Sequence, residues 1–360
     1  MHRACRAAFA LLLLPSLSGC YLMHTAGGQL DLNSRREPIE EVVADASTPP
    51  DVRAQLELVT RVREFAIREL GLPDNGSYRS YADLGRPYVV WNVFAAPEFS
   101  VDPKTWCFPV AGCVAYRGYF VERKAREFGE RLERDGYDVL VGGVPAYSTL
   151  GHFEDPVLNT MLGWGELQLA GTIFHELSHQ LLYVPGDSAF NEAFATVVED
   201  EGVRRWLAAS GREPELAEFQ ARRLRAARIA TLLGEGRDRL RELYAQPLAA
   251  DAKRAAKAAE FERLRAEYAA LERAWGRGGY ERLFGPQMNN ASLLAVATYH
   301  DCVPGLEARL EAVGRGLPRF YDEARRLAKL PRDERHAALC RAGAPAPLSA
   351  PSRAPPSSWP

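Results

Sequence analysis

After Pro50 the chain carries apolar residues at the spacing of an amphipathic helix. The recurring positions are Leu56, Val59, Val62, Phe65 and Ala66. Residues at these intervals lie on one side of a helix and can face a core. Gly71 follows, and glycine is the residue most often found just after a helix end. The pattern therefore predicts a helix from Pro50 to about Leu70.

Between residues 86 and 147 the pattern changes to short apolar segments bounded by Gly and Pro. Three of them are rich in β-branched and aromatic residues, namely Tyr88 to Phe94, Val114 to Phe120 and Val139 to Tyr147. Such segments are typical of strands. The intervening stretch from Glu122 to Asp135 is charged and reads as a helix. We therefore expect a small sheet with a helix between its last two strands.

From Leu162 to Val184 the chain is apolar for long enough to form a buried helix, which Pro185-Gly186 should end. Asp187 and Ser188 are both good N-cap residues, so a second helix should begin there and run to about Ala209. Residues 213–285 are rich in Ala, Arg, Glu and Leu and predict a long helical hairpin, whose charges are those of a solvated face. Further helical segments should follow Met288-Asn289-Asn290 and reach about Ala342.

These elements predict a mainly helical α+β protein organised around one large domain. The expected divisions are an export signal at 1–19, a tether at 20–50, the domain at 51–342 and a disordered Pro-rich tail at 343–360. The chain has 360 residues, of which 47% are hydrophobic and 26% are charged, which suits a globular protein with a proper core. Its net charge of −2 and its interleaved Arg and acidic residues argue against a nucleic-acid partner.

The N-terminus reads as an export signal. His2, Arg3 and Arg6 precede an apolar run from Ala7 to Leu17, which is shorter than the ~20 residues that span a bilayer. It ends in Leu17-Ser18-Gly19-Cys20, which resembles a bacterial lipobox. The resemblance implies that Cys20 becomes the acylated first residue, and Tyr21 in place of Asp favours the outer membrane, facing the periplasm. The alternative is an ordinary signal peptide with a chance cysteine.

Four further cysteines would meet an oxidising compartment, where an even set indicates disulfides. Cys107 and Cys113 close a short loop and form the first expected pair. Cys302 with Cys340 follows only by elimination, and this pairing stays open. No C-x-x-C spacing supports a metal-binding role for any of the four.

The strongest chemical signal is His175-Glu176-Leu177-Ser178-His179 within the apolar helix. Residues four apart lie one turn above each other, so both imidazoles can reach one cation, and Zn²⁺ favours nitrogen ligands. Glu176 is placed to act on a water molecule without binding the metal. This is the H-E-x-x-H zincin pattern. The alternative is a pair of histidines that are satisfied by other contacts.

A catalytic zinc also needs a third protein ligand. Asn191-Glu192-Ala193-Phe194-Ala195 begins the next helix, and the break at Pro185-Gly186 would let that helix turn back toward the first. The run resembles the gluzincins, which implies Glu192 as the third ligand and Glu199 as a supporting acid. The interval between the two halves is shorter than in the best-known gluzincins. The alternative for Glu192 is an acid favoured by the helix dipole.

Hydrolysis would use Glu176 as the general base, with a hydrogen-bond donor for the oxyanion. The candidate donors are Tyr183, Tyr147, Tyr299 and His300, and for each a structural role is also open. Tyr147 ends a predicted strand just before the active-site helix, a place where zincins pair a strand with an extended substrate.

Three further segments resemble a bacterial family of predicted aminopeptidases with zincin domains. They are Ala146–Gly151 with Asp155–Leu158, Trp106–Cys113 with Tyr116–Phe120, and Asn289–Ala291 with Ala297–Tyr299. The resemblance implies a zincin-like fold and a lipid-anchored zinc metallopeptidase acting on peptides. His152 departs from the aromatic residue expected at its position.

Three alternatives remain at this point. An endopeptidase of envelope proteins would carry the same motif, because no spacing singles out the carboxylate that an aminopeptidase needs for the free amine. The candidates for that carboxylate are Glu154, Asp155, Glu166 and Glu199. A non-catalytic lipoprotein with a structural zinc is the second alternative, although Glu176 would then have no use. The hairpin at 213–285 as a partner-binding arm is the third.

Overall fold

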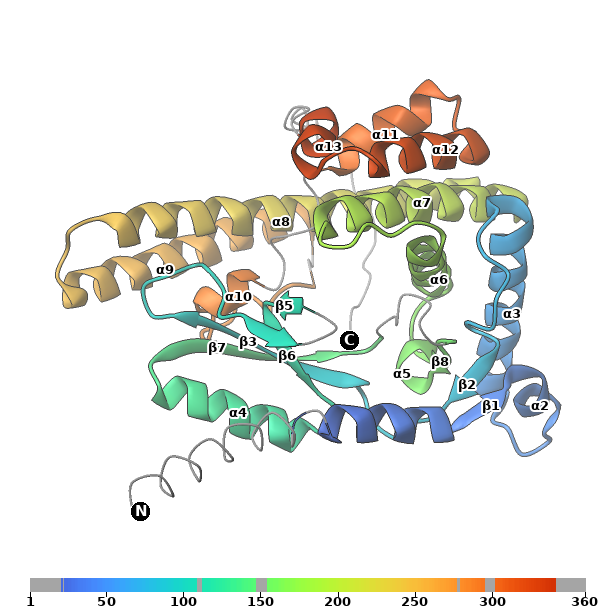
Figure 1. Cartoon of the computed structure of the whole chain (residues 1–360), viewed down its shortest axis with the longest axis horizontal. Helices are drawn as coiled ribbons and strands as arrows, with labels where there is room; N and C mark the ends of the chain where they lie inside the picture. Colours follow the sequence, from blue (N-terminus) through green and yellow to red (C-terminus); the bar gives the residue numbers. More distant parts are fainter. Residues whose placement is uncertain are drawn as a thin grey trace, which may run out of the picture.

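The computed structural model describes residues 21, 23–108, 112–146, 154–276, 279–294 and 302–340. The fold is α+β and mainly helical, as the sequence predicts, with long helices arranged around small sheets (Figure 1). The expected export signal, the C-terminal tail, Cys20, Tyr147 and Tyr299 lie outside the described residues.

The first predicted helix is present with the predicted limits. Helix α3 covers Pro50–Leu70 and ends at Gly71, whose φ of 66° is the left-handed conformation that glycine adopts without strain. Its apolar side enters the main core, where Leu56, Val59 and Val62 are fully buried. The helix forms one side of the molecule in Figure 1 and packs against the helices that carry the candidate site.

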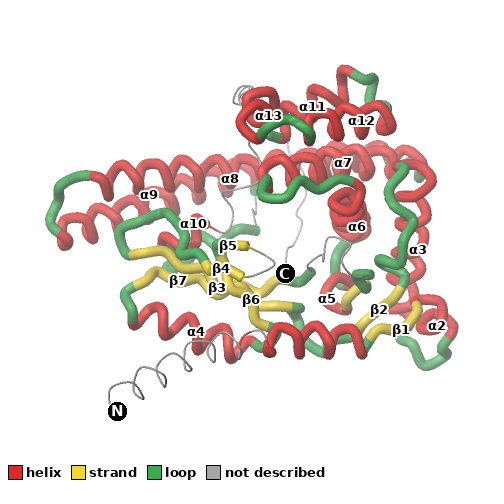
Figure 2. Tube along the Cα trace, in the orientation of Figure 1, coloured by secondary structure: helices red, strands yellow, loops and turns green. Residues whose placement is uncertain are grey.

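The three predicted strands form one antiparallel sheet. Strand β3 (Val90–Pro97) lies between β6 (Tyr116–Tyr119) and β7 (Tyr137–Val144), and α4 (Glu122–Arg134) packs against it. A short hairpin of β4 (Trp106–Phe108) and β5 (Gly112–Val114) contains the expected Cys107–Cys113 disulfide. A second small sheet lies toward the right of Figure 2, apart from the first sheet. It consists of β1 (Arg36–Pro38), β2 (Ser80–Ala82) and β8 (Val157–Leu158).

The stretch expected to be a tether is in part folded. Residues 23–34 are helical, and β1 and α2 (Ile39–Ala44) follow directly. Leu32 and Ile39 are buried in the main core, and β1 pairs with β2. The folded unit therefore begins before residue 51, because apolar side chains in this mixed segment find partners that its own pattern does not reveal.

The predicted buried helix begins later than the sequence suggests. A short α5 (Asn159–Leu162) precedes α6 (Glu166–Leu181), and Gly163 and Gly165 lie between them. Helix α7 (Ser188–Ala209) follows, with Asp187 as its N-cap, and its side chain accepts a hydrogen bond from the Phe190 N–H. Helices α6 and α7 pack against each other, and the Phe174 ring of α6 lies against Gly202 of α7, where a Cβ would come within 2.6 Å of the ring.

The remaining helices form two groups. After the 3₁₀ turn η1 (Glu213–Glu215), α8 (Leu216–Ala245) and α9 (Ala250–Trp275) form the long hairpin, with a core of its own around Leu232, Leu233 and Leu264. Helix α10 (Asn290–Leu294) packs against the β3–β7 sheet.

The second group lies over α7 and comprises α11 (Val303–Ala312), α12 (Leu317–Ala328) and α13 (Arg332–Leu339). A disulfide joins Cys302 to Cys340, which is the pairing that the sequence left open.

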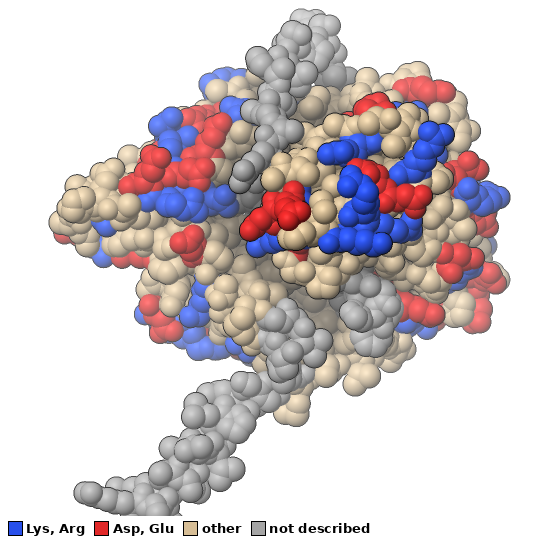
Figure 3. All heavy atoms as spheres, turned by 45° about the horizontal axis from the view of Figure 1, so that its top comes forward, with Lys and Arg blue, Asp and Glu red and all other residues tan. Residues whose placement is uncertain are grey.

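The molecular surface carries mixed charge. Acidic and basic side chains are interleaved over the face that Figure 3 presents. Within the part of the chain that the structure describes, none of the helices has both the length and the apolar character needed to cross a bilayer.

Candidate metal centre

Helix α6 places the two histidines of the motif on one face. His175 and His179 stand one turn apart, with 3.2 Å between their Nε2 atoms and 4.8 Å between ring centroids. His179 is buried and His175 is largely buried. The two nitrogens therefore point at a common place at the edge of the core, as the spacing predicts.

The turn between α6 and α7 brings Glu192 to the same place. Asn191 fixes this turn, because its side chain accepts a hydrogen bond from the Val184 N–H (2.8 Å) and donates one to the Val184 carbonyl (2.9 Å). Glu192 then lies 3.3 Å from His175 Nε2 through Oε2 and 3.8 Å from His179 Nε2 through Oε1. Asn191 therefore fixes the turn, and Glu192 supplies a possible ligand atom.

The donor set fits a zinc ion. One ligand atom each from His175, His179 and Glu192 lie within 4.8 Å of one another. Four ligands bonded tetrahedrally to zinc at its usual bond lengths are about 3.3 Å apart. The two histidine nitrogens are 3.2 Å apart, and Glu192 approaches them at 3.3 Å through Oε2 and at 3.8 Å through Oε1, so the nearest donor atoms lie near that value. Glu192 is partly exposed, so an open side remains for a substrate or water.

Charged residues lie on the Nδ1 side of the His175 ring. His175 Nδ1 lies 3.1 Å from Glu199 Oε2, so this carboxylate fixes the orientation and the tautomer of the ring. Gly171 leaves room for Glu199, since a Cβ there would come within 3.0 Å of its carboxylate. Arg223 of α8 lies 3.6 Å from Glu199 and 2.8 Å from Asp200. The hairpin therefore contributes a cation to the surroundings of the site.

The electrostatics of the group favour one positive charge. Burial lowers the pKa of His175, but hydrogen bonds to the Glu192 and Glu199 carboxylates outweigh burial and raise that pKa to about 10. Burial and the neighbouring charge of His175 lower the pKa of His179 to about 4. Burial raises the pKa of Glu192, yet its hydrogen bond with His175 leaves the pKa below the ordinary value. The carboxylates that stabilise a proton on His175 would also stabilise a metal cation at the same position.

Glu176 lies beside the group without belonging to the ligand set. Its carboxylate is close enough to contribute to the raised pKa of His175. Burial, together with the charges of Glu176 and Asp155, also holds the pKa of Tyr78 well above its ordinary value. Tyr78 was not a sequence candidate, because its loop gives no sign that it packs beside the active-site helix.

Two tyrosines border the ligand group. The Tyr183 ring centroid is 6.4 Å from that of His179. Burial raises the pKa of Tyr116 on β6, and the charges of Glu192 and Tyr183 raise it further. Tyr183 was a candidate from the sequence, whereas Tyr116 was assigned only to a strand. Its charge interaction with Glu192 joins residues 76 positions apart in the sequence, and no local pattern encodes that.

Two of the expected acids are engaged elsewhere. Glu166 accepts hydrogen bonds from Trp206 and Arg212, and the exposed Glu154 lies 3.4 Å from Arg36. Glu199 is bound to His175, as described above. Asp155, the fourth candidate, is buried, and its backbone carbonyl accepts a hydrogen bond from the Tyr78 N–H (2.6 Å). These contacts do not single out one described carboxylate for a free α-amine.

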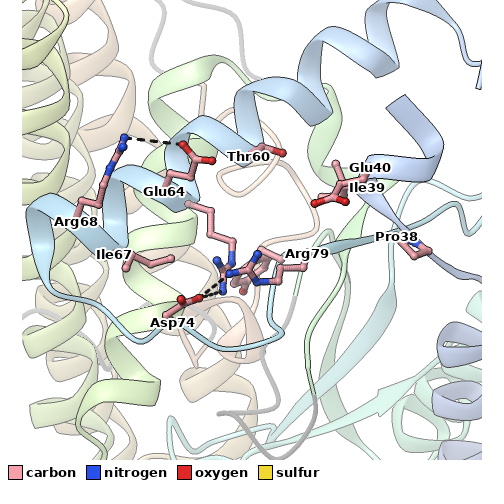
Figure 4. Close-up of a pocket in the computed structure, with 11 residues that line it drawn as sticks. Pro38, Ile39, Glu40, Thr60, Glu64, Ile67, Arg68, Asp74 and Arg79 are labelled. Carbon is pink, nitrogen blue, oxygen red and sulfur yellow. Dashed lines mark hydrogen bonds and ion pairs between the residues drawn. The ribbon is translucent and has the colours of Figure 1, made fainter. Parts of the chain in front are cut away.

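A cavity of about 540 Å³ lies beside α3 and is lined by residues that include Glu64, Arg68, Asp74 and Arg79 (Figure 4). Several of its charges are paired, since Arg79 lies 2.6 Å from Asp74 and Arg68 lies 3.9 Å from Glu64. Because none of the three metal-group residues lines this cavity, the metal group remains the candidate site.

A second set of metal-type side chains is present among the described residues, formed by Cys302, His336 and Cys340. Both sulfur atoms are joined in a disulfide, and His336 Nε2 lies 2.8 Å from Asp187. Its donor atoms are therefore already engaged with one another and with Asp187.

Comparisons with known proteins give one result. A model of the protein family described as "Putative aminopeptidase" matches residues 20–339. The searches of curated proteins and of solved structures returned no match.

Proposed function

The chain belongs to the "Putative aminopeptidase" family, as the resemblance of its motifs predicts, and on that premise we propose that it is a zinc-dependent metallopeptidase. The observation that carries the proposal is the convergence of His175, His179 and Glu192 at the separations of a tetrahedral zinc site, with Glu176 beside them. A purely structural zinc would have no use for that additional carboxylate.

The ligand set would hold zinc through His175 Nε2, His179 Nε2 and a carboxylate oxygen of Glu192. Zinc bound there supplies a Lewis acid that polarises the scissile carbonyl and acidifies water. Glu199 orients His175 through Nδ1, and Asn191 keeps Glu192 in reach by fixing the turn. These five side chains come from both halves of the sequence motif.

Glu176 is the proposed proton carrier. It accepts a proton from the attacking water and later gives it to the leaving amine. Tyr116 and Tyr183 border the same space and are the proposed oxyanion donors among the described residues. The substrate is a peptide, and the family description makes an exopeptidase acting at the free N-terminus the first choice.

We place this activity in the cell envelope. The lipobox-like Leu17-Ser18-Gly19-Cys20 supports acylation at Cys20 and attachment to the outer membrane, facing the periplasm. The Cys107–Cys113 and Cys302–Cys340 disulfides support an oxidising compartment.

The decisive variant is Glu176→Gln, which keeps the size of the side chain and removes the base. We expect about one zinc per chain in both proteins and a loss of cleavage of roughly 10²-fold or more in the variant. Metal analysis and digestion of a peptide library measure the two properties. Glu57→Gln, at an exposed position of α3, is the matched control and should keep both the zinc content and the cleavage activity. A chain without zinc, or a Glu176→Gln variant with full activity, would overturn the proposal.

The same digest separates the two modes of cleavage. Peptides with a free N-terminus should be shortened by one residue at a time, and their N-acetylated counterparts should resist. Cleavage of both sets at internal bonds would make the enzyme an endopeptidase while leaving the zinc mechanism intact.

A further inference from the structure

The residue that follows the proposed lipid site is docked onto the folded domain. The Tyr21 hydroxyl donates a hydrogen bond to the Gly118 carbonyl of β6 (3.0 Å), and the Arg117 guanidinium lies 3.8 Å from the centre of the Tyr21 ring. The ring also packs edge-on against Tyr119, with 5.6 Å between centroids. Cys20 directly precedes Tyr21 in the sequence.

The helical segment after Tyr21 is held by one of its sides. The Phe120 N–H donates to His24 Nε2 (3.3 Å), and Leu32 is buried in the main core. Gly28 lies directly on Phe120, because a Cβ there would come within 2.2 Å of that ring. The segment is therefore packed along its length and lies beside α4 at the lower edge of Figure 1.

The opposite side of the same segment is exposed and apolar. Met23, Ala26, Gly27 and Leu30 are all exposed and recur at the three- and four-residue spacing of one helix face. Met23 is 70% exposed and Leu30 is 68% exposed, which makes them the two most exposed large apolar side chains among the described residues. We call these four residues the apolar stripe.

We infer that the apolar stripe lies in the outer-membrane surface and holds the domain at a fixed orientation on the bilayer. The inference rests on the proposed acylation of Cys20, and not on the peptidase activity. Acyl chains on Cys20 must enter the bilayer, and the docking of Tyr21 brings the stripe to the same level. An in-plane helix with an apolar face adds membrane affinity to a lipid anchor. Lys124, close to His24, borders the segment and suits anionic headgroups.

The test uses the full acylated chain in vesicles of phosphatidylethanolamine and phosphatidylglycerol. Ala26→Cys supplies the one free thiol, since Cys20 is acylated and the other four cysteines form disulfides. When the protein is bound to vesicles, iodide should quench a fluorophore on this thiol less strongly, by about five-fold or more, than it does in solution. Leu248→Cys at the tip of the hairpin, 41% exposed, is the matched control and should stay fully accessible.

A second variant separates the stripe from the lipid. Met23→Asp with Leu30→Asp, added to the labelled chain, should restore iodide access while the acyl chains keep the protein on the vesicles. Both side chains are exposed, so thermal unfolding should not change, and Leu248→Asp should have no effect on access. Equal quenching at both labelled positions in an acylated chain would overturn the inference. So would loss of a dimer in the double variant, which would show that a second copy covers the stripe. A chain whose intact mass shows no acylation would instead remove the premise, with the peptidase proposal unaffected.

Discussion

Glu199 holds the first histidine of the metal group through its hydrogen bond to His175 Nδ1. A carboxylate in this position fixes the imidazole ring and increases its basicity as a ligand. Replacement by Gln would keep the size of the side chain but would remove its charge. The role of Glu199 is therefore to position His175, and it is separable from proton transfer by Glu176.

We predict that Glu199→Gln weakens zinc binding by about 10- to 100-fold. The measurement is competition for zinc against a chelator of known affinity. Glu176→Gln is the contrasting variant, because it should retain zinc affinity and lose turnover. Equal zinc affinity in Glu199→Gln and the unmodified chain would contradict the positioning role.

At this scale the sequence predicts what is local. The four-residue interval between His175 and His179 determines that both rings share a face, and one tight turn is enough to bring in Glu192. Arg223 and Tyr116 escaped prediction because they come from a hairpin and a strand whose positions in the fold are decided by packing over many residues. Their types, an arginine on a charged helix and a tyrosine on a strand, are ordinary in those settings.

At the scale of elements, α13 acts as a clasp on the start of α7. Arg335 of α13 makes a buried ion pair with Asp187 (2.5 Å), and Asp187 caps α7 through the Phe190 N–H. The Cys302–Cys340 disulfide holds the end of α13 against the start of α11. The helix that carries Glu192 therefore starts from a point fixed by the C-terminal helices.

We predict that Cys302→Ser with Cys340→Ser lowers the free energy of unfolding by roughly 4 kcal/mol, because the bond closes a long loop with a sequence separation of 38. The comparison is Cys107→Ser with Cys113→Ser, which opens a loop with a separation of 6 and should cost only about 2 kcal/mol. Urea denaturation of both double variants measures the difference. An equal or smaller loss for the longer loop would show that the α13 clasp is held by the Arg335–Asp187 pair alone.

The boundaries of the elements show which signals the chain carries locally. Helical periodicity and Gly71 predicted α3 correctly, and Asp187 predicted the start of α7. The expectation of one helix from 162 to 184 was wrong at its beginning, because Gly163 and Gly165 interrupt the run and α6 begins only at Glu166. The helix at 23–34 was missed because its mixed composition shows no clear apolar face. Only Leu32 and Gly28 mark the side of this helix that packs against the domain.

For the whole molecule, Glu201 is the point where three parts of the chain meet. Its carboxylate is fully buried on α7 and pairs with Arg204, Arg205 and Arg315. Arg205 also donates to the Glu69 carbonyl at the end of α3, and Arg315 belongs to the turn between α11 and α12. Burial raises the pKa of Glu201, but the three guanidinium groups outweigh burial and hold the pKa at about 2.

This pKa makes stability depend on acid in a defined window. The unfolded chain protonates Glu201 near its ordinary pKa of 4.5, whereas the folded chain does so only near 2. Between these values the unfolded state binds more protons, so stability is fully present above pH 4.5 and is lost as pH falls toward 2. The shift corresponds to about 3 kcal/mol.

We predict two effects of Glu201→Gln. At neutral pH the variant should be less stable by about 3–5 kcal/mol, because three arginines lose a buried partner. Between pH 5 and pH 2 its free energy of unfolding should fall by about 3 kcal/mol less than that of the unmodified chain, since position 201 no longer titrates. Urea denaturation across this range measures both, and Glu57→Gln, at an exposed position on α3, controls for the loss of one acid. Parallel pH profiles for the three proteins would mean that the Glu201 cluster does not join α3, α7 and the C-terminal helices in the way its contacts imply.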